Sequence, residues 1–312
     1  MKSRVSKMLD LKYPIFQGAM AWISEASLVA AVSEAGGLGI LAAGSAPTDH
    51  IRKEIRKIKA STDKPFGVNI MLISENAEEI ADLVCEEGVK VVTTGAGLPG
   101  KYMERWKENN IIVIPVVASV AMAKRLERSG ADAVIAEGTE AGGHIGELTT
   151  MALVPQIVDA VSIPVIAAGG IADGRGIAAA FMLGADAVQM GTRFLSAHEC
   201  IIHDNYKQKI INAKDIDTVV SGRRTGHPVR VLKNRLTKQF QDLDTSLAPL
   251  EEYEKLGQGA LAKGVIEGDT AYGSLMAGQI AALVKKEQSC QDIITEIYEE
   301  AKQILSKANE IL

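Results

Sequence analysis

The sequence predicts a single (β/α)8 TIM barrel with a lid or small subdomain inserted after the eighth strand. Short runs rich in Val and Ile alternate with helix-like segments about eight times in the first two-thirds of the 312 residues. Most of these runs lack polar alternation, which is typical of parallel strands buried on both faces. A doubly wound open sheet shares this periodicity and stays an alternative, but the number of strands favours the barrel.

Each element of the barrel follows from this alternation. Strands are expected at 14–17, 38–41, 66–70, 89–93, 111–117, 133–136, 164–168 and 187–190. Helices are expected at 25–35, 48–60, 76–87, 100–109, 120–129, 151–160 and 174–183. Four glycines stand where helices should end, because glycine readily takes the positive φ of a helix terminus; they are Gly36, Gly88, Gly130 and Gly184.

The chain after the eighth strand has a different character. The barrel is expected to occupy residues 1–195, and the more polar, irregular segment 196–273 is predicted to be an inserted substrate or lid subdomain. Long extensions of this fold usually serve the end of the barrel that carries the active site. Two helices, at 274–286 and 290–308, are expected to close the barrel within a C-terminal region, 274–312.

Composition excludes several classes of function. Aromatic residues make up only 4% of the chain and the net charge is -5, which argues against binding to nucleic acid. No apolar run is long enough to span a bilayer and no secretory signal is visible, so we expect a cytoplasmic protein without membrane contact. The three cysteines are far apart, which argues against a disulfide framework or a thiolate zinc site.

The ends of the seventh and eighth strands are rich in glycine. Gly169 and Gly170 follow the seventh strand, and Gly191 and Thr192 follow the eighth. Glycine lets backbone N–H groups approach an anion, and the loops after these two strands are where barrels commonly hold phosphate. We therefore predict a phosphate site there, with the Thr192 hydroxyl as a further donor. The alternative is a pair of tight turns that only close the barrel.

The sixth strand leads into a loop, 137–146, that contains a histidine. His144 at the catalytic end of a barrel can give or take a proton near neutral pH, although it could also only cap a turn. Gly142 and Gly143 would let the backbone pass close to a flat ring. Glu137 could accept a hydrogen bond from a ligand hydroxyl or hold Gly143 in place.

Two residues near other strand ends are further candidates. Asn69 is an amide inside a Val- and Ile-rich strand, and burial of an amide without a partner is costly. It suits the mixed hydrogen-bonding edge of a ring, but a structural bond across the barrel mouth explains it equally well. Met20 lies among small residues after the first strand and would border a planar ring, or simply pack there.

Two motif matches are discounted. Residues 95–100 fit G-x-G-x-x-G, but no acidic residue follows the next strand, as dinucleotide binding would require. His198 and His203 resemble a zinc protease motif, but they are five positions apart and do not share a helix face. We assign no metal ligands from the sequence.

A basic run stands out against the acidic background. Residues 222–238 contain no Asp or Glu. A solvated surface is the usual explanation of such a run, and a docking patch for an acidic partner or a phosphorylated arm is the alternative. Its cations are Arg223, Arg224, Arg230, Lys233, Arg235 and Lys238.

Taken together, these motifs resemble the FMN-dependent enoyl-acyl-carrier-protein reductase II family, which is related to the nitronate monooxygenases (2-nitropropane dioxygenases). The most specific segments are 64–69, 136–144 and 189–193, and segment 226–230 is similar to the reductase branch. One departure is Ala19, where the family often has a second glycine.

The resemblance implies an FMN-dependent oxidoreductase that reduces trans-2-enoyl groups on acyl carrier protein with NADH or NADPH, as part of fatty acid biosynthesis. It also implies a homodimer, and some members respond to a monovalent cation. His144 would be catalytic, and the implied cofactor contacts are Met20, Asn69, Gly169, Gly170, Gln189, Met190, Gly191 and Thr192.

Two other functions remain open at this point. A nitronate monooxygenase would use the same histidine as a base and oxygen as the oxidant. A barrel that binds a phosphorylated metabolite without redox chemistry would carry no flavin, so the purified protein would be colourless.

Overall fold

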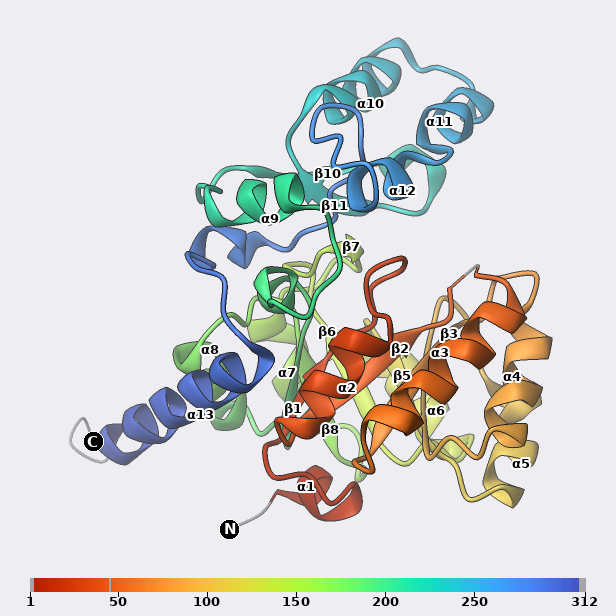
Figure 1. Cartoon of the computed structure of the whole chain (residues 1–312), viewed down its shortest axis with the longest axis vertical. Helices are drawn as coiled ribbons and strands as arrows, with labels where there is room; N and C mark the ends of the chain where they lie inside the picture. The colour runs from red at the N-terminus through yellow and green to blue at the C-terminus, as the bar shows by residue number, and fades with distance from the viewer. Residues whose placement is uncertain (1–2, 45, 309–312) are drawn as a thin grey trace.

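Eight parallel strands form a closed barrel in the computed structural model, which describes residues 3–44 and 46–308 (Figure 1). The strands, in their order around the barrel, are β1 (Ile15–Gln17), β2 (Leu38–Ala42), β3 (Phe66–Met71), β4 (Val91–Gly95), β5 (Ile112–Val117), β6 (Val134–Glu137), β8 (Val165–Ala168) and β9 (Ala187–Met190). The barrel closes where β9 pairs with β1, with Gln189 opposite Phe16. The predicted barrel is confirmed, and the open sheet is excluded.

Helices follow most of the strands, as predicted. They are α2 (Ala26–Glu34), α3 (Thr48–Ser61), α4 (Ala77–Glu86), α5 (Gly100–Glu108), α6 (Val120–Arg128), α7 (Thr150–Val158) and α8 (Gly174–Met182). Side-chain caps fix two of the starts: Ser119 accepts a hydrogen bond from the Met122 N–H, and Asp173 accepts from Arg175 N–H. Each of the four predicted helix-ending glycines has positive φ.

The apolar core continues to one end of the barrel. Phe16, Ile40 and Ile166 belong to one buried cluster, which also includes Val5 and Leu9 from the N-terminal region. The short helix α1 (Arg4–Met8), which the sequence analysis did not anticipate, therefore covers the amino-terminal end of the strands. This leaves the carboxyl ends for the site. None of the described helices is long and apolar enough to cross a membrane.

The eighth strand–helix unit is split by the inserted segment. After β9 the chain forms a 3-10 turn, η1 (Thr192–Ser196), and leaves the barrel. It returns as α13 (Cys290–Lys307), which packs against both α8 and α2 and so takes the place of the eighth helix (Figure 1). The predicted helix at 290–308 is confirmed, and its role is to complete the ring of helices.

The helix expected at 274–286 is wrong. Only a 3-10 turn, η3 (Gln279–Leu283), forms there. The backbone of this segment is engaged elsewhere, because Leu275 O accepts a hydrogen bond from Leu232 N–H and the Gln279 N–H donates to Glu140 O. These contacts with distant segments compete with the hydrogen bonds that a helix would need.

The inserted segment forms a small subdomain beyond the barrel mouth (Figure 1). Its elements are α9 (Asp204–Ile211), β10 (Thr218–Ser221), η2 (Arg223–Thr225), β11 (Val229–Leu232), α10 (Arg235–Ser246), α11 (Leu250–Gly257) and α12 (Ala260–Val265). Strand β11 pairs antiparallel with β10 on one side and with β7 (Gly143–His144) on the other. This three-stranded sheet joins the subdomain to the loop that follows β6.

Candidate active site

The two glycine-rich turns lie on neighbouring strands at the carboxyl end of the barrel. Glu137 of β6 pairs with Ala168 of β8, and Ala168 pairs with Gln189 of β9. The turns that follow β8 and β9 are therefore adjacent, and the loop after β6 stands beside them. This adjacency is what the sequence analysis required for one shared site.

Backbone amides at these turns have no acceptor within the protein. Gly169 and Gly170 have φ of 90° and 73°, which only glycine adopts readily. Within residues 3–44 and 46–308, the N–H groups of Gly169, Gly170 and Gly191 donate no hydrogen bond. Unpaired amides at adjacent strand ends can bind an anion. The Thr192 hydroxyl accepts from the Gly278 N–H at 2.9 Å, which holds its oxygen at the same place.

Segment 274–286, which was expected to be helical, instead holds the site loops together. A Cβ atom on Gly142 would lie 2.7 Å from the backbone of Ala277, so the loop after β6 packs directly on this segment. The Gly278 N–H reaches Thr192, and the Gln279 N–H donates to Glu140 O at 2.9 Å. The sequence analysis missed this role because it assigned the segment to a helix.

Glu140 and Thr150 form a second link between the loops, which sequence reasoning also missed. The Glu140 carboxylate accepts hydrogen bonds from the Thr150 N–H and from the Thr150 hydroxyl at 2.9 Å. Thr150 Oγ1 also lies 3.0 Å from the carbonyl oxygen of Gly169. The loop after β6 is thereby fixed against the turn after β8. No pattern in the sequence signals this pair, because its members belong to different elements.

His144 is exposed at the barrel mouth, on the short strand β7. Its ring approaches that of His227 edge-on, with 6.5 Å between the ring centroids. Although the His144 side chain is exposed, the protein around it partly excludes water, which lowers the pKa of His144. The neighbouring His227 lowers this pKa further. A neutral imidazole is favoured, which can hold or pass on a single proton.

Glu137 ends β6 with a carboxyl group that lacks a partner. No hydrogen bond to this side chain forms in the described part of the chain, so it does not hold Gly143 as one interpretation required. Burial raises the pKa of Glu137 to about 7. An unpaired carboxyl at the mouth is costly unless a ligand satisfies it, which favours the other interpretation.

Asn69 makes the structural bond that the sequence analysis left open. Its Nδ2 donates to Thr93 Oγ1 on the next strand at 2.9 Å. Asn69 Oδ1 has no partner among the described residues and remains available to a ligand. The amide nitrogen of Asn69 is therefore hydrogen-bonded to Thr93, while its amide oxygen can still accept a hydrogen bond from a ligand.

Met20, Gln189 and Met190 gather beside the glycines. A Cβ atom on Gly191 would lie 3.5 Å from Met20 Sδ, and one on Gly18 would lie 3.1 Å from the Gln189 side chain. The Gln189 amide has no hydrogen bond within the described residues. Met190 points into the apolar core, and its carbonyl accepts from the Gly18 N–H at 2.9 Å. Met190 therefore faces the site with its backbone and not with its side chain.

The basic run faces two environments. Arg230 is a correction to the predicted docking set, because it is buried and its Nε donates to Thr139 O at 3.1 Å. Arg223 pairs with Glu147 at 2.9 Å on the exposed surface. The cations of the run that stay exposed are Arg223, Arg224, Lys233, Arg235 and Lys238.

The fold and site define a barrel enzyme whose mouth combines unpaired glycine amides with an imidazole. The sequence model of the nitronate monooxygenase family matches residues 2–300, and the chain belongs to this family of oxidoreductases. The resemblance inferred from the sequence motifs is thereby confirmed.

Individual relatives resemble the chain over its full length. FabK from Thermotoga maritima has 49% sequence identity and a TM-score of 0.98, with 100% of both chains covered. A probable nitronate monooxygenase from Staphylococcus saprophyticus is 35% identical over 98% of this chain and 99% of its own. A (3aS,4S,5R,7aS)-5-hydroxy-7a-methyl-1-oxo-octahydro-1H-indene-4-carboxyl-CoA dehydrogenase from Mycobacterium tuberculosis is 33% identical over 100% of this chain and 99% of its own.

Proposed function

We propose that this protein is a flavin-dependent enoyl-acyl-carrier-protein reductase that uses NADH or NADPH and serves fatty acid biosynthesis. The observation that carries the proposal is the set of unpaired amides of Gly169, Gly170 and Gly191, on adjacent strand ends beside the His144 loop. Full-length similarity to FabK at 49% identity supports the same assignment.

The residues at the mouth fit FMN. The phosphate would bind the unpaired amides of Gly169, Gly170 and Gly191, with the Thr192 hydroxyl beside them. The polar edge of the ring would meet Asn69 Oδ1 and the Gln189 amide, which lack partners in the described chain. The remaining contacts would come from Met20, Glu137, Gly143 and the Met190 backbone.

When bound, FMN would supply the redox chemistry, accepting a hydride from the nicotinamide and giving it to the β-carbon of the enoyl thioester. The chain itself handles charge and protons. As hydride arrives, negative charge grows on the thioester oxygen, and His144 would donate a hydrogen bond to it, since the β7–β11 pairing already engages the Gly143 backbone. In its protonated form His144 would also deliver the proton that reaches the α-carbon, since an imidazolium of lowered pKa gives up its proton readily.

The inserted subdomain, 196–273, would act as the lid and the docking surface for the carrier protein. It is hydrogen-bonded to the His144 strand through β11, so a carrier bound to it would stand beside the catalytic histidine. The exposed cations Arg223, Arg224, Lys233, Arg235 and Lys238 would attract an acidic partner. We also propose a cytoplasmic homodimer whose activity responds to a monovalent cation, as the family resemblance suggests.

Absorbance spectroscopy tests the proposal in one sequence of additions. The purified protein should be yellow, NADH or NADPH should bleach it under anaerobic conditions, and crotonyl thioester should then restore the colour. A colourless protein, or one that binds no added FMN, would exclude redox chemistry and leave a barrel for phosphorylated metabolites.

Nitronate oxidation is the second candidate, because curated relatives at 35% identity carry the name probable nitronate monooxygenase. In that reaction His144 would remove the proton α to the nitro group of a neutral nitroalkane to form the nitronate, and oxygen would be the oxidant. Turnover of crotonyl thioester should exceed turnover of alkyl nitronates if the reductase assignment is right. The reverse order would favour the monooxygenase. A relative named as a carboxyl-CoA dehydrogenase supports a thioester as the substrate of this chain.

A further inference from the structure

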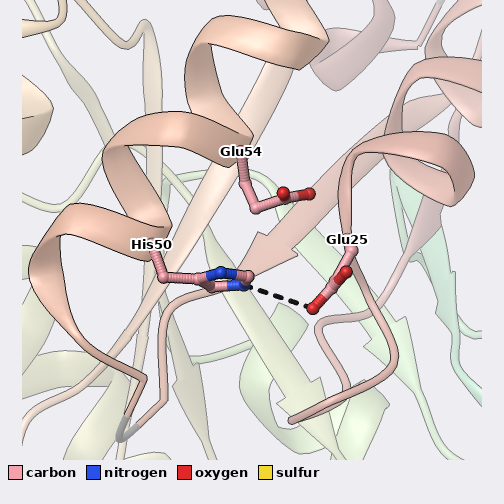
Figure 2. Close-up of side chains that lie close together, drawn as sticks. All are labelled: Glu25, His50 and Glu54. Atoms are coloured by element: carbon pink, nitrogen blue, oxygen red, sulfur yellow. Dashed lines mark hydrogen bonds and ion pairs between the residues drawn. The ribbon is translucent and has the colours of Figure 1, made fainter.

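A second cluster of reactive side chains lies outside the flavin region, between the helices that follow β1 and β2. Glu25 stands immediately before α2, and His50 and Glu54 are one turn apart on α3. Figure 2 shows the three side chains pointing toward one another. One ligand atom from each lies within 4.8 Å of the other two. The sequence analysis assigned no metal ligands, because Glu25 is far from the other two residues in the chain.

The spacing of His50 and Glu54 suits a shared ion. Residues four positions apart lie on the same face of a helix, one above the other. His50 Nε2 is 3.2 Å from Glu25 Oε1. Two ligands on a tetrahedral zinc ion, each at about 2.0–2.1 Å, stand about 3.3 Å apart. Glu25 and His50 are therefore already at the separation that two zinc ligands require. Glu54 completes the set within 4.8 Å.

Glu54 is a fixed and ionised anchor. Its side chain is 2% exposed, and its carboxylate accepts from the Ala26 N–H at 2.9 Å and from Lys57 at 2.6 Å. Burial opposes ionisation of this group, but these two donors outweigh burial and lower the pKa of Glu54. Each carboxylate oxygen keeps a second lone pair, and the Lys57 side chain, 65% exposed, can swing away into solvent.

The other two ligands are accessible enough to receive an ion. The side chains of His50 and Glu25 are 42% and 31% exposed. Both line a pocket of about 210 Å³, together with Trp22 and Gly44. The pocket gives an ion a path of entry and leaves room for water in the remaining coordination position.

We propose that Glu25, His50 and Glu54 bind one divalent transition-metal ion of the Zn²⁺ class. An imidazole with two carboxylates is a ligand set that zinc accepts, and it leaves a fourth position open. The ion would join the start of α2 to α3 and so fix the loop between β1 and α2, which carries Met20. This proposal does not depend on the proposed reductase activity.

Calorimetric titration of the purified, full-length protein with Zn²⁺ tests the site. His50→Gln keeps a hydrogen-bond donor for Glu25, so a merely structural pair would survive it, whereas Zn²⁺ affinity should fall about 100-fold. Glu54→Gln should weaken binding similarly. Lys57→Met should tighten binding, because it removes the cation that competes for Glu54. Circular dichroism of each variant verifies that it is folded.

The His144–His227 pair provides the matched control, since two imidazoles approach each other there. His227→Ala should leave the titration unchanged. The proposal is overturned if the wild-type protein binds no Zn²⁺ below millimolar concentration. It is also overturned if His227→Ala abolishes binding while His50→Gln does not, or if Lys57→Met weakens it.

Discussion

The barrel supplies the site with glycine amides together with side chains such as Asn69 and His144, whereas the inserted subdomain adds side chains. Gly169, Gly170 and Gly191 offer amides whose positions are set by the register of β8 and β9. The subdomain adds the His227 ring and the Arg230 guanidinium by way of the β7–β11 pairing. The groups predicted to bind a ligand therefore lie on the barrel, and the subdomain stands beside the His144 strand through β11. Four changes would break or sharpen this comparison.

The largest effect should come from His144, where the two regions meet. His144→Ala should slow enoyl reduction at least about 100-fold, because a positioned proton donor contributes that much or more. Reduction of the flavin by NADH or NADPH should be kept. Stopped-flow absorbance separates the two half-reactions. His227→Ala should have a much smaller effect, and a wild-type rate of enoyl reduction in His144→Ala would contradict the assigned role.

The next effect concerns the rigidity of the barrel. A Cβ atom on Gly39 of β2 would lie 2.1 Å from Val29 O of α2, so Gly39→Ala should destabilise the fold by about 3 kcal/mol. Gly67→Ala, on the adjacent strand, is the matched control because its nearest neighbour would be 3.5 Å away. Urea unfolding of both variants measures the difference. Equal stability of the two would mean that α2 can shift on the sheet.

A pH effect of intermediate size should come from Glu137. Its pKa of about 7 in the folded protein lies above the ordinary value of 4.5. The folded state therefore holds a proton that the unfolded state has already released, and stability should fall as pH rises between these values. Thermal unfolding of flavin-free protein across this range should show the slope, and Glu137→Gln should reduce it. An unchanged slope in Glu137→Gln would assign it to other groups.

The smallest effect should come from the surface of the subdomain. Lys233→Ala combined with Lys238→Ala should raise KM for an enoyl group on acyl carrier protein about threefold, since exposed charges chiefly affect encounter with a partner. KM for the same enoyl group on a short thioester should not change. Steady-state kinetics at low and high salt measure both. Equal increases for the two substrates would place the effect at the active site instead.

The barrel was predictable because its signal repeats. Every barrel strand and every helix from α2 to α8 lies within two residues of its expected position, since buried runs recur in each unit and glycines end four of the helices. The family could also be predicted, from motifs at the ends of β3, β6 and β9. Which residues bind flavin stays a prediction.

The subdomain was less predictable because its contacts depend on partners distant in the sequence. A two-residue strand such as β7 has no periodicity, so its pairing with β11 could not be inferred. The sequence did indicate that Arg230 is buried, because this residue lies inside the apolar run of β11. It was nevertheless assigned to the surface. The helix expected at 274–286 failed because hydrogen bonds to Leu232 and Glu140, invisible in a local window, determine that backbone.

The position of α13 has a consequence for how the protein is made. The helix that completes the ring between α8 and α2 is synthesised only after the whole inserted segment. Until then β9 and β1 can pair, but the apolar surface between α8 and α2 has no cover. That seam therefore stays uncovered until the inserted segment and α13 have both been synthesised, and loss of a few turns of α13 would expose it permanently.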